Sequence, residues 1–169
     1  NTRERKIKQK DQIYQLIDLY TLFYMQFCHP ASTDTAFWTH QMGKPRQNTW
    51  YGLAFERICM LHIPQIKQQL GIAQIYTEYY SWRSKLSTPA SQIDLLIERA
   101  DNLVNLCEIK YSQAPYSITK EEDMRIRTRI ADFVGETKIR HGVLTTLITT
   151  FGLRPNPYSS IAQVQLTMD

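Results

Sequence analysis

The amino-acid sequence predicts an α/β domain, and three observations point to it. Amphipathic, helix-length segments and β-branched, strand-length segments follow one another in the order helix, strand, strand, strand, helix, strand. The two middle strands are close enough to form a hairpin. The chain has 169 residues, of which 43% are hydrophobic and 21% charged, so it suits one globular domain with room for an appendage. The expected elements are residues 49–70, 72–82, 92–99, 103–110, 119–138 and 142–151.

We expect an N-terminal helical and linker segment at residues 1–48, before a folded domain at 49–169. Its first twelve residues are polar and charged, which is typical of a solvated helix start or a frayed end. Tyr14 to Phe27 has helical length but is apolar nearly all round, so this helix must be buried on the core or on a second copy of the chain. The later Gly43-Lys44 is no phosphate loop, because the G-x-x-x-x-G-K-[ST] pattern is absent.

The first helix of the domain is expected to begin near Thr49 or Trp50 and to stop at Gly71. Pro64 should kink this helix or split it in two. Glu56 is unusual because apolar residues follow it three, four and seven positions later, so that an acid heads an apolar face. Either it lies in the first turns and favours the helix dipole, or it belongs to a site.

The first strand, residues 72–82, is recognised by its alternating pattern. The next two strands flank Ala100-Asp101-Asn102, and acids interrupt their apolar runs. If residues 100–102 form the hairpin loop, Asp94 lies opposite Glu108. Glu108 and Lys110 share one strand face, because side chains alternate with a period of two.

Two carboxylates and an ammonium group would then meet on one face of the sheet. Like charges this close repel unless a cation lies between them, and a divalent metal beside Lys110 is one solution. The alternative is an edge hairpin whose acids are solvated. A register slip of one residue would also separate Asp94 from Glu108.

The second helix begins with a capping box, Thr119 to Glu122, and should run to about Lys138. Its buried face is expected to carry Ile126, Ile130, Phe133, Val134 and Thr137. Basic residues off that face form a solvated surface or contact phosphates: they are Arg125, Arg127, Arg129, Lys138 and Arg140. A central strand at 142–151 follows, and residues 152–169 read as a tail with turns.

Composition narrows the class of protein further. The net charge of +4 and pI of 9.0 are compatible with a polyanionic partner. Three scattered cysteines favour buried free thiols in an intracellular, cytoplasmic protein, and no Cys/His pattern indicates zinc. We expect no membrane segment and no signal peptide. The first residue is not methionine, so we expect a fragment of a longer chain.

The element order and the acids resemble the PD-(D/E)xK nuclease superfamily over about residues 50–151. The residues that carry the resemblance are Glu56 in the first helix, Asp94 in the second strand and Glu108-Ile-Lys110 in the third. Several stretches look more closely like the C-terminal domain of a group of bacterial and archaeal ATPases. They include Trp50-Tyr-Gly-Leu-Ala-Phe-Glu56, Gln92-Ile-Asp-Leu-Leu-Ile97, Leu106-Cys-Glu-Ile-Lys-Tyr-Ser112 and Leu147-Ile-Thr-Thr-Phe-Gly-Leu153.

This resemblance implies an αβββαβ restriction-endonuclease-like core with a mixed central sheet flanked by helices. It implies a nuclease acting on DNA with Mg²⁺ or Mn²⁺, held by Asp94, Glu108, Glu56 and the Ile109 carbonyl. Lys110 would act in catalysis, and Gln92 would support Asp94. The parent protein would carry an AAA-type P-loop ATPase domain and a winged-helix segment, whose tail is residues 1–48, so ATP would enter through the missing N-terminal domain alone.

A rival interpretation is a non-catalytic DNA-binding or interaction module that regulates its attached ATPase. All four motif positions are filled in this sequence, which favours catalysis. A small-molecule enzyme has no motif behind it.

Overall fold

The computed structural model describes residues 16–28 and 34–168. The start of the predicted first helix at Tyr14 and its end at His29-Pro30 lie outside these residues. The chain divides into two compact units, residues 1–44 and residues 45–169, each of which is described by itself. Within the described residues, no helix is both long enough and apolar enough to cross a membrane.

The first unit contains α1 (Leu19–Phe27) and α2 (Phe37–Gln41). The Asp18 carboxylate caps α1 by accepting a hydrogen bond from the Thr21 amide. The rings of Phe23 and Phe27 lie 5.1 and 5.3 Å from that of Trp38 in α2, centroid to centroid. One side of α1 therefore packs on α2, whereas Tyr20 and other large side chains of the helix are exposed. Packing of α1 on a second copy of the chain stays a prediction.

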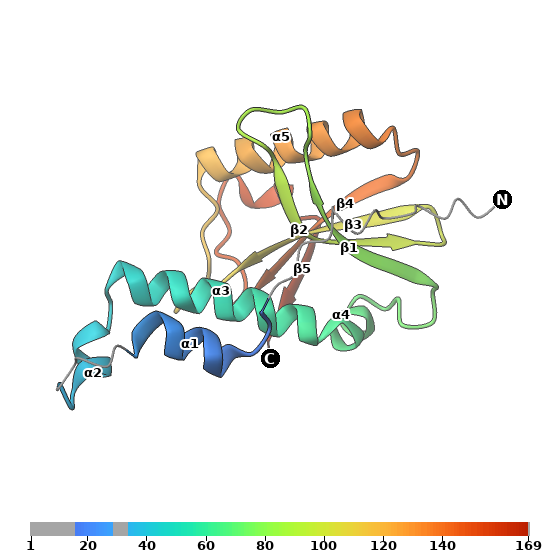
Figure 1. Ribbon diagram of the computed structural model, residues 1–169. Helices are drawn as coiled ribbons and strands as arrows, with labels where there is room; N and C mark the ends of the chain where they lie inside the picture. Colours follow the sequence, from blue (N-terminus) through green and yellow to red (C-terminus); the bar gives the residue numbers. More distant parts are fainter. Residues whose placement is uncertain (1–15, 29–33, 169) are drawn as a thin grey trace. The chain divides into compact units, whose positions relative to one another are not determined.

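The second unit is a five-stranded mixed sheet with helices on both faces (Figure 1). The strands lie in the order of the chain: β1 to β3 form an antiparallel meander, while β3, β4 and β5 are parallel. This confirms the predicted α/β class. The elements are α3 (Pro45–Leu61), α4 (Ile63–Gln69), β1 (Thr77–Arg83), β2 (Gln92–Arg99), β3 (Leu103–Lys110), α5 (Lys120–Thr137), β4 (Gly142–Thr149), a 3₁₀ turn η2 (Ser159–Ile161) and β5 (Val164–Thr167).

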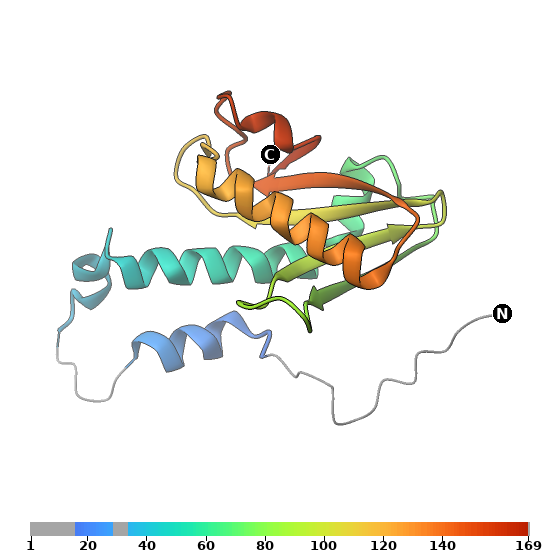
Figure 2. The same ribbon diagram turned by 90° about the horizontal axis from the view of Figure 1, so that it is seen from above.

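The two faces of the sheet have separate cores. Figure 2, seen from above, shows α5 lying across the strands. Helices α3 and α4 cover one face, where Phe55 and Ile66 pack on Leu95 and Cys107. Helix α5 covers the other face, where Phe133 packs on Leu106. A polar side chain at the end of β2 or β3 therefore lies beside α3 or beside α5, depending on which face it points to.

The helices follow most of the predicted signals, but α3 begins at Pro45, four residues before the predicted start at Thr49 and inside the predicted linker. The chain between α3 and α4 breaks at His62, and Pro64 lies in the first turn of α4, so the proline splits the predicted helix in two. The capping box at Thr119 and Glu122 starts α5 as expected. The helix ends at Lys138, which has a left-handed φ of 52°. Val134, expected on the buried face, is exposed.

Two predictions for the strands were wrong in extent. The first strand starts at Thr77 instead of 72, because Gly71 has a left-handed φ of 69° and the chain turns before it extends. The tail is not wholly irregular, because it forms β5 parallel to β4, with Leu166 beside Ile148. The four residues of this strand are too few for a clear alternating pattern.

The central hairpin has the predicted loop and register. Asn102, with φ 65°, turns the chain between β2 and β3. The pairs run from Leu95 opposite Cys107 to Glu98 opposite Val104. The pairing of β2 with β3 ends at Leu95 opposite Cys107, so the predicted register holds over these pairs but Asp94 is not paired with Glu108.

Candidate functional site

Glu108, near the end of β3, is the centre of a compact group of charges. Its side chain is buried, and both carboxylate oxygens contact cations. The Lys110 ammonium lies 2.7 Å from Oε1, and the Arg129 guanidinium donates to Oε2 at 2.6 Å. Glu108 points to the face of the sheet that α5 covers, so the Arg129 side chain reaches it from this helix.

The pKa of Glu108 shows which effect dominates this group. Burial disfavours the carboxylate, but the Lys110 ammonium and the Arg129 guanidinium together outweigh burial. The pKa of Glu108 is therefore lower than its ordinary value, and Glu108 is charged at neutral pH.

Asp94 lies at a bulge in β2, next to the hairpin pairs. Tyr80 pairs with Leu96 and Trp82 pairs with Ile93, so Asp94 and Leu95 together oppose Ser81 alone. The Gln92 amide donates to the Asp94 carboxylate at 2.7 Å, which fixes the orientation of that side chain. A bulge changes the direction in which side chains point, and here it does so at the predicted site acid.

Helix α3 brings Glu56 to the same edge of the sheet. The Tyr111 ring lies 5.1 Å from that of Tyr51 and 6.3 Å from that of Phe55, centroid to centroid. Because Glu56 follows Phe55 and Lys110 precedes Tyr111, this aromatic contact holds α3 against the end of β3. Glu56 is therefore held near Lys110, and the charges of Asp94 and Glu108 also act on it. The catalytic role of the four predicted residues stays a prediction.

The pKa of Glu56 is raised, and the causes identify its neighbours. Burial is the largest cause, and the negative charge of Asp94 is the next. The positive charges of Lys110 and Arg57 oppose this rise, and the charge of Glu108 adds to it. Burial and the neighbouring carboxylates thus make ionisation of Glu56 costly. The alternative that Glu56 lies in the first turns of its helix is wrong, because α3 begins at Pro45 and Glu56 lies nearer its other end.

We expect Glu56→Gln to stabilise the chain at neutral pH relative to the parent. A raised pKa in the folded state means that Glu56 contributes stability below its unfolded pKa and that this contribution is lost as pH rises through the folded pKa. Unfolding midpoints in urea, measured for both proteins from pH 4 to pH 8, should therefore separate as pH rises, roughly over that range. Parallel curves at all pH values would contradict the repulsion between Glu56 and Asp94.

A small hollow of about 20 Å³ lies beside Glu108, between the end of β3 and the first turns of α5. Its charged lining consists of Glu108, Lys110, Glu122, Arg125 and Arg129. Glu122 already accepts hydrogen bonds from the Thr119 amide and the Tyr116 hydroxyl. Three cationic side chains thus line the hollow with the two carboxylates of Glu108 and Glu122, and this excess of positive charge attracts an anion.

The five predicted basic residues do not lie together in the structure. Arg125 and Arg129, one helical turn apart, both line the hollow. Arg127 points elsewhere and pairs with Asp123 at 2.9 Å, while Lys138 and Arg140 are exposed at the other end of α5. The placement of Arg129 off the buried face was wrong: it follows Ile126 by three residues and precedes Phe133 by four, so it belongs to their face.

The residue types of the predicted site suit a hard divalent cation, but cations surround Glu108 in the structure. Asp94 and Glu108 offer carboxylate oxygens and Ile109 a main-chain carbonyl, the ligand types that Mg²⁺ and Mn²⁺ prefer. Among the residues that the structure describes, no group of three or more His, Cys, Asp or Glu side chains is arranged to hold a metal ion. A metal here would depend on two carboxylates and the carbonyl, with Glu56 close by.

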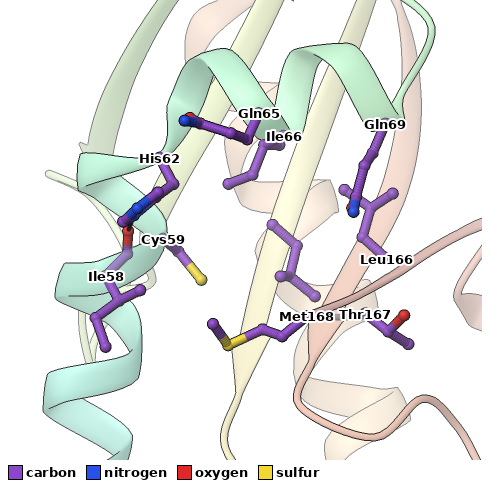
Figure 3. Close-up of a pocket in the computed structure, with 10 residues that line it drawn as sticks. Ile58, Cys59, His62, Gln65, Ile66, Gln69, Leu166, Thr167 and Met168 are labelled. Atoms are coloured by element: carbon purple, nitrogen blue, oxygen red, sulfur yellow. Dashed lines mark hydrogen bonds between the residues drawn. The ribbon is translucent and has the colours of Figure 1, made fainter.

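A second pocket, with a volume of about 240 Å³, lies between the α3–α4 break and the ends of β4 and β5. Figure 3 shows Gln65 and Gln69 of α4 beside it, with Cys59, Leu166 and Met168 among the lining residues. Burial, followed by the charge of Glu56, raises the pKa of Cys59 to about 12, so this thiol is not a nucleophile. The pocket is mostly apolar and has none of the charged groups gathered at Glu108.

Comparisons with known proteins give a structural likeness and no family. No protein-family model matches the chain, and no curated protein matches it. One solved structure, titled as the protein of unknown function AF1548, is similar with a TM-score of 0.42 and 16% identity. The match covers 60% of this chain and 53% of that one, so it spans about half the length of AF1548.

Proposed function

We propose that residues 45–168 form a PD-(D/E)xK-type nuclease domain that hydrolyses DNA phosphodiester bonds with Mg²⁺ or Mn²⁺. The observation that carries the proposal is the contact between Glu108 and Lys110, which lie 2.7 Å apart at the end of β3. The order of α3, β1–β3, α5 and β4 agrees with the αβββαβ core that this superfamily implies. Glu56 contributes a fourth group, because Asp94 and Lys110 act on its pKa.

Each side chain has a role that its surroundings support. When bound by Asp94, Glu108 and the Ile109 carbonyl, a divalent cation would supply charge neutralisation and a water of lowered pKa. Lys110, held 2.7 Å from Glu108, is placed to stabilise charge that develops on the phosphate. Glu56, whose pKa is raised, is suited to accept a proton from a nearby water. Gln92 keeps the Asp94 carboxylate in one orientation.

The DNA contacts would come from the cations beside the site. Arg125 and Arg129 line the same hollow as Lys110, and phosphate oxygens bind well to guanidinium groups. Arg127 on α5, and Lys138 and Arg140 just after the C-terminal end of this helix, would add weak contacts whose strength falls with salt. In the parent protein, the partner domain would be an N-terminal AAA-type ATPase.

A specific observation keeps a second candidate open, the non-catalytic DNA-binding module. Both oxygens of Glu108 are already bound by cations, as they are in a structural ion pair. In that case the group would hold α5 on β3 and leave DNA binding to the basic residues.

The test is divalent-dependent cleavage of supercoiled plasmid by the parent chain and by Asp94→Asn. The Asp94 carboxylate accepts a hydrogen bond from the Gln92 amide, which an asparagine oxygen can also accept, so the variant should fold. We expect cleavage to require Mg²⁺ or Mn²⁺ and to fall about a hundredfold or more in the variant, because a ligand charge is lost. Glu78→Gln, an exposed acid on the edge strand β1, is the matched control and should cut like the parent.

Two outcomes would decide against catalysis. Equal cleavage by Asp94→Asn and the parent would point to a contaminating nuclease. If neither protein cuts but both retain DNA binding, the interaction module becomes the better account.

A further inference from the structure

The pocket between the α3–α4 break and the ends of β4 and β5 is large enough for a small molecule. Helix α3 ends at Leu61 and α4 begins at Ile63, while β5, at the edge of the sheet, has only four residues. The side chains of these short elements leave a space of about 240 Å³. An aliphatic cavity of about 150 Å³ binds benzene, so this pocket has room for a larger ring system.

The pocket also lies where α/β proteins commonly bind ligands, outside the carboxyl ends of parallel strands. Strands β4 and β5 are parallel, and Ile148 and Leu166 line the pocket from their last-but-one positions. Ile66 of α4 closes the pocket from the helix side (Figure 3). No residue of the predicted nuclease site lines this pocket, so its ligand is separate from the proposed DNA substrate.

The lining favours a neutral ligand. The ten described residues that form it include no Asp, Glu, Lys or Arg. A charged group that enters apolar surroundings without a partner loses its hydration, which is costly, so phosphates and carboxylates fit the pocket poorly. The lining does carry two sulfur atoms, those of Cys59 and Met168 (Figure 3). Sulfur makes favourable contacts with aromatic rings, so an aromatic ligand suits this lining.

A few polar groups on the helix side supply hydrogen bonds. Gln65 and Gln69 both line the pocket and lie one turn apart on α4. Each amide offers a donor and an acceptor, so it can bind an N–H or a carbonyl at the edge of a ring. The His62 ring is held in place because its Nδ1 donates to the Ile58 carbonyl at 2.7 Å. An apolar pocket with a small number of polar groups is typical of a small-molecule site.

We infer that this pocket binds a neutral, rigid, largely apolar heteroaromatic molecule of about the size of indole. Its ring lies among the aliphatic and sulfur-containing side chains, and its polar edge bonds to Gln65 or Gln69. A rigid ring loses little conformational freedom on binding. Water is held poorly by a mostly apolar lining, so its displacement by the ring favours binding.

The experiment is a titration of the ¹⁵N-labelled whole chain with indole, followed by NMR, for the parent, Gln69→Glu and Gln68→Glu. Each substitution keeps the side-chain shape and adds one negative charge. Gln68 is the matched control, because it is exposed on the same helix and is not among the residues that line the pocket. We expect the parent to bind indole with a Kd of about 1 mM or lower, as for a ligand of about nine non-hydrogen atoms. Gln69→Glu should bind about fivefold or more weakly, because indole would cover the added charge.

The position of the signal changes locates the ligand. The main-chain signals of Cys59, Ile66 and Leu166 should shift and saturate, while those of Glu108 and Arg129 stay in place. Shifts that rise linearly to the solubility limit of indole, or that spread over the whole surface, would overturn the inference. Equal affinity in Gln69→Glu and Gln68→Glu would do the same. These outcomes leave the nuclease proposal untouched, because none of them depends on DNA cleavage.

A second probe tests whether the ligand has to be neutral. Indole-3-acetate carries the same ring with a carboxylate added. It should bind the parent about tenfold or more weakly than indole, because the lining offers its charge no partner. Binding as tight as that of indole would contradict a pocket for neutral ligands.

Discussion

Replacing Lys110 with alanine is expected to slow single-turnover DNA cleavage by about a hundredfold or more while leaving most DNA affinity. The charge that develops in the transition state lies at one phosphate, where a positioned cation contributes about 3 kcal/mol or more. Binding of DNA in the ground state is spread over many phosphate contacts, each of them modest. Arg125, Arg127 and Arg129 remain available for those contacts.

The structure also explains why this variant should fold. Lys110 lies at the last position of β3, and its side chain is 32% exposed. Glu108 keeps Arg129 as a partner when the ammonium is removed. The core residues behind it, Cys107 and Ile109, are unchanged.

The measurement is metal-dependent cleavage and DNA binding, side by side, for the parent, Lys110→Ala and Lys67→Ala. Lys67 lies on α4, and its loss should change neither quantity by more than about twofold, as for a surface charge. Unchanged cleavage by Lys110→Ala would remove this lysine from the mechanism.

The parts of the fold that the sequence predicted best are those fixed by local chemistry. The hairpin loop at 100–102 and the pairing of β2 with β3 follow from a short polar break between two apolar runs. The start of α5 follows from the reciprocal hydrogen bonds of Thr119 and Glu122. Pro64 could only interrupt a helix, and α3 ends before it.

The parts that were missed depend on tertiary contacts. The bulge at Asp94 arises from pairing with β1 through Ser81, and no local signal marks it. Strand β5 forms by parallel pairing with β4, which is a contact between separate elements. The position of Arg129 on the buried face of α5 could have been predicted, because its spacing from Ile126 and Phe133 marks that face. What the spacing could not give was its partner, Glu108, on another element.

Glu108→Gln should lower the free energy of unfolding at pH 7 by about 2 kcal/mol, the largest loss of stability we expect from one substitution at the site. Removing one member of a buried ion pair costs about 3–5 kcal/mol, because the other charge is left without compensation. Here the two cations are 29% and 32% exposed, so water partly replaces the carboxylate and the loss is smaller. The same variant should also fail to bind Mn²⁺.

The pH dependence of this loss identifies its origin. Glu108 has a lowered folded pKa, so its contribution to stability is present above its unfolded pKa and is lost as pH falls through the folded pKa. Urea unfolding of the parent and of Glu108→Gln should therefore differ at pH 7, begin to converge below about pH 4, where the carboxyl becomes protonated in the unfolded chain, and meet only below the folded pKa. In the Arg129→Met background the effect of Glu108→Gln should be smaller, because the two groups are coupled. If Glu108→Gln is as stable as the parent at pH 7, or if the two proteins differ by the same amount at every pH, the ion pairs with Lys110 and Arg129 do not stabilise the fold.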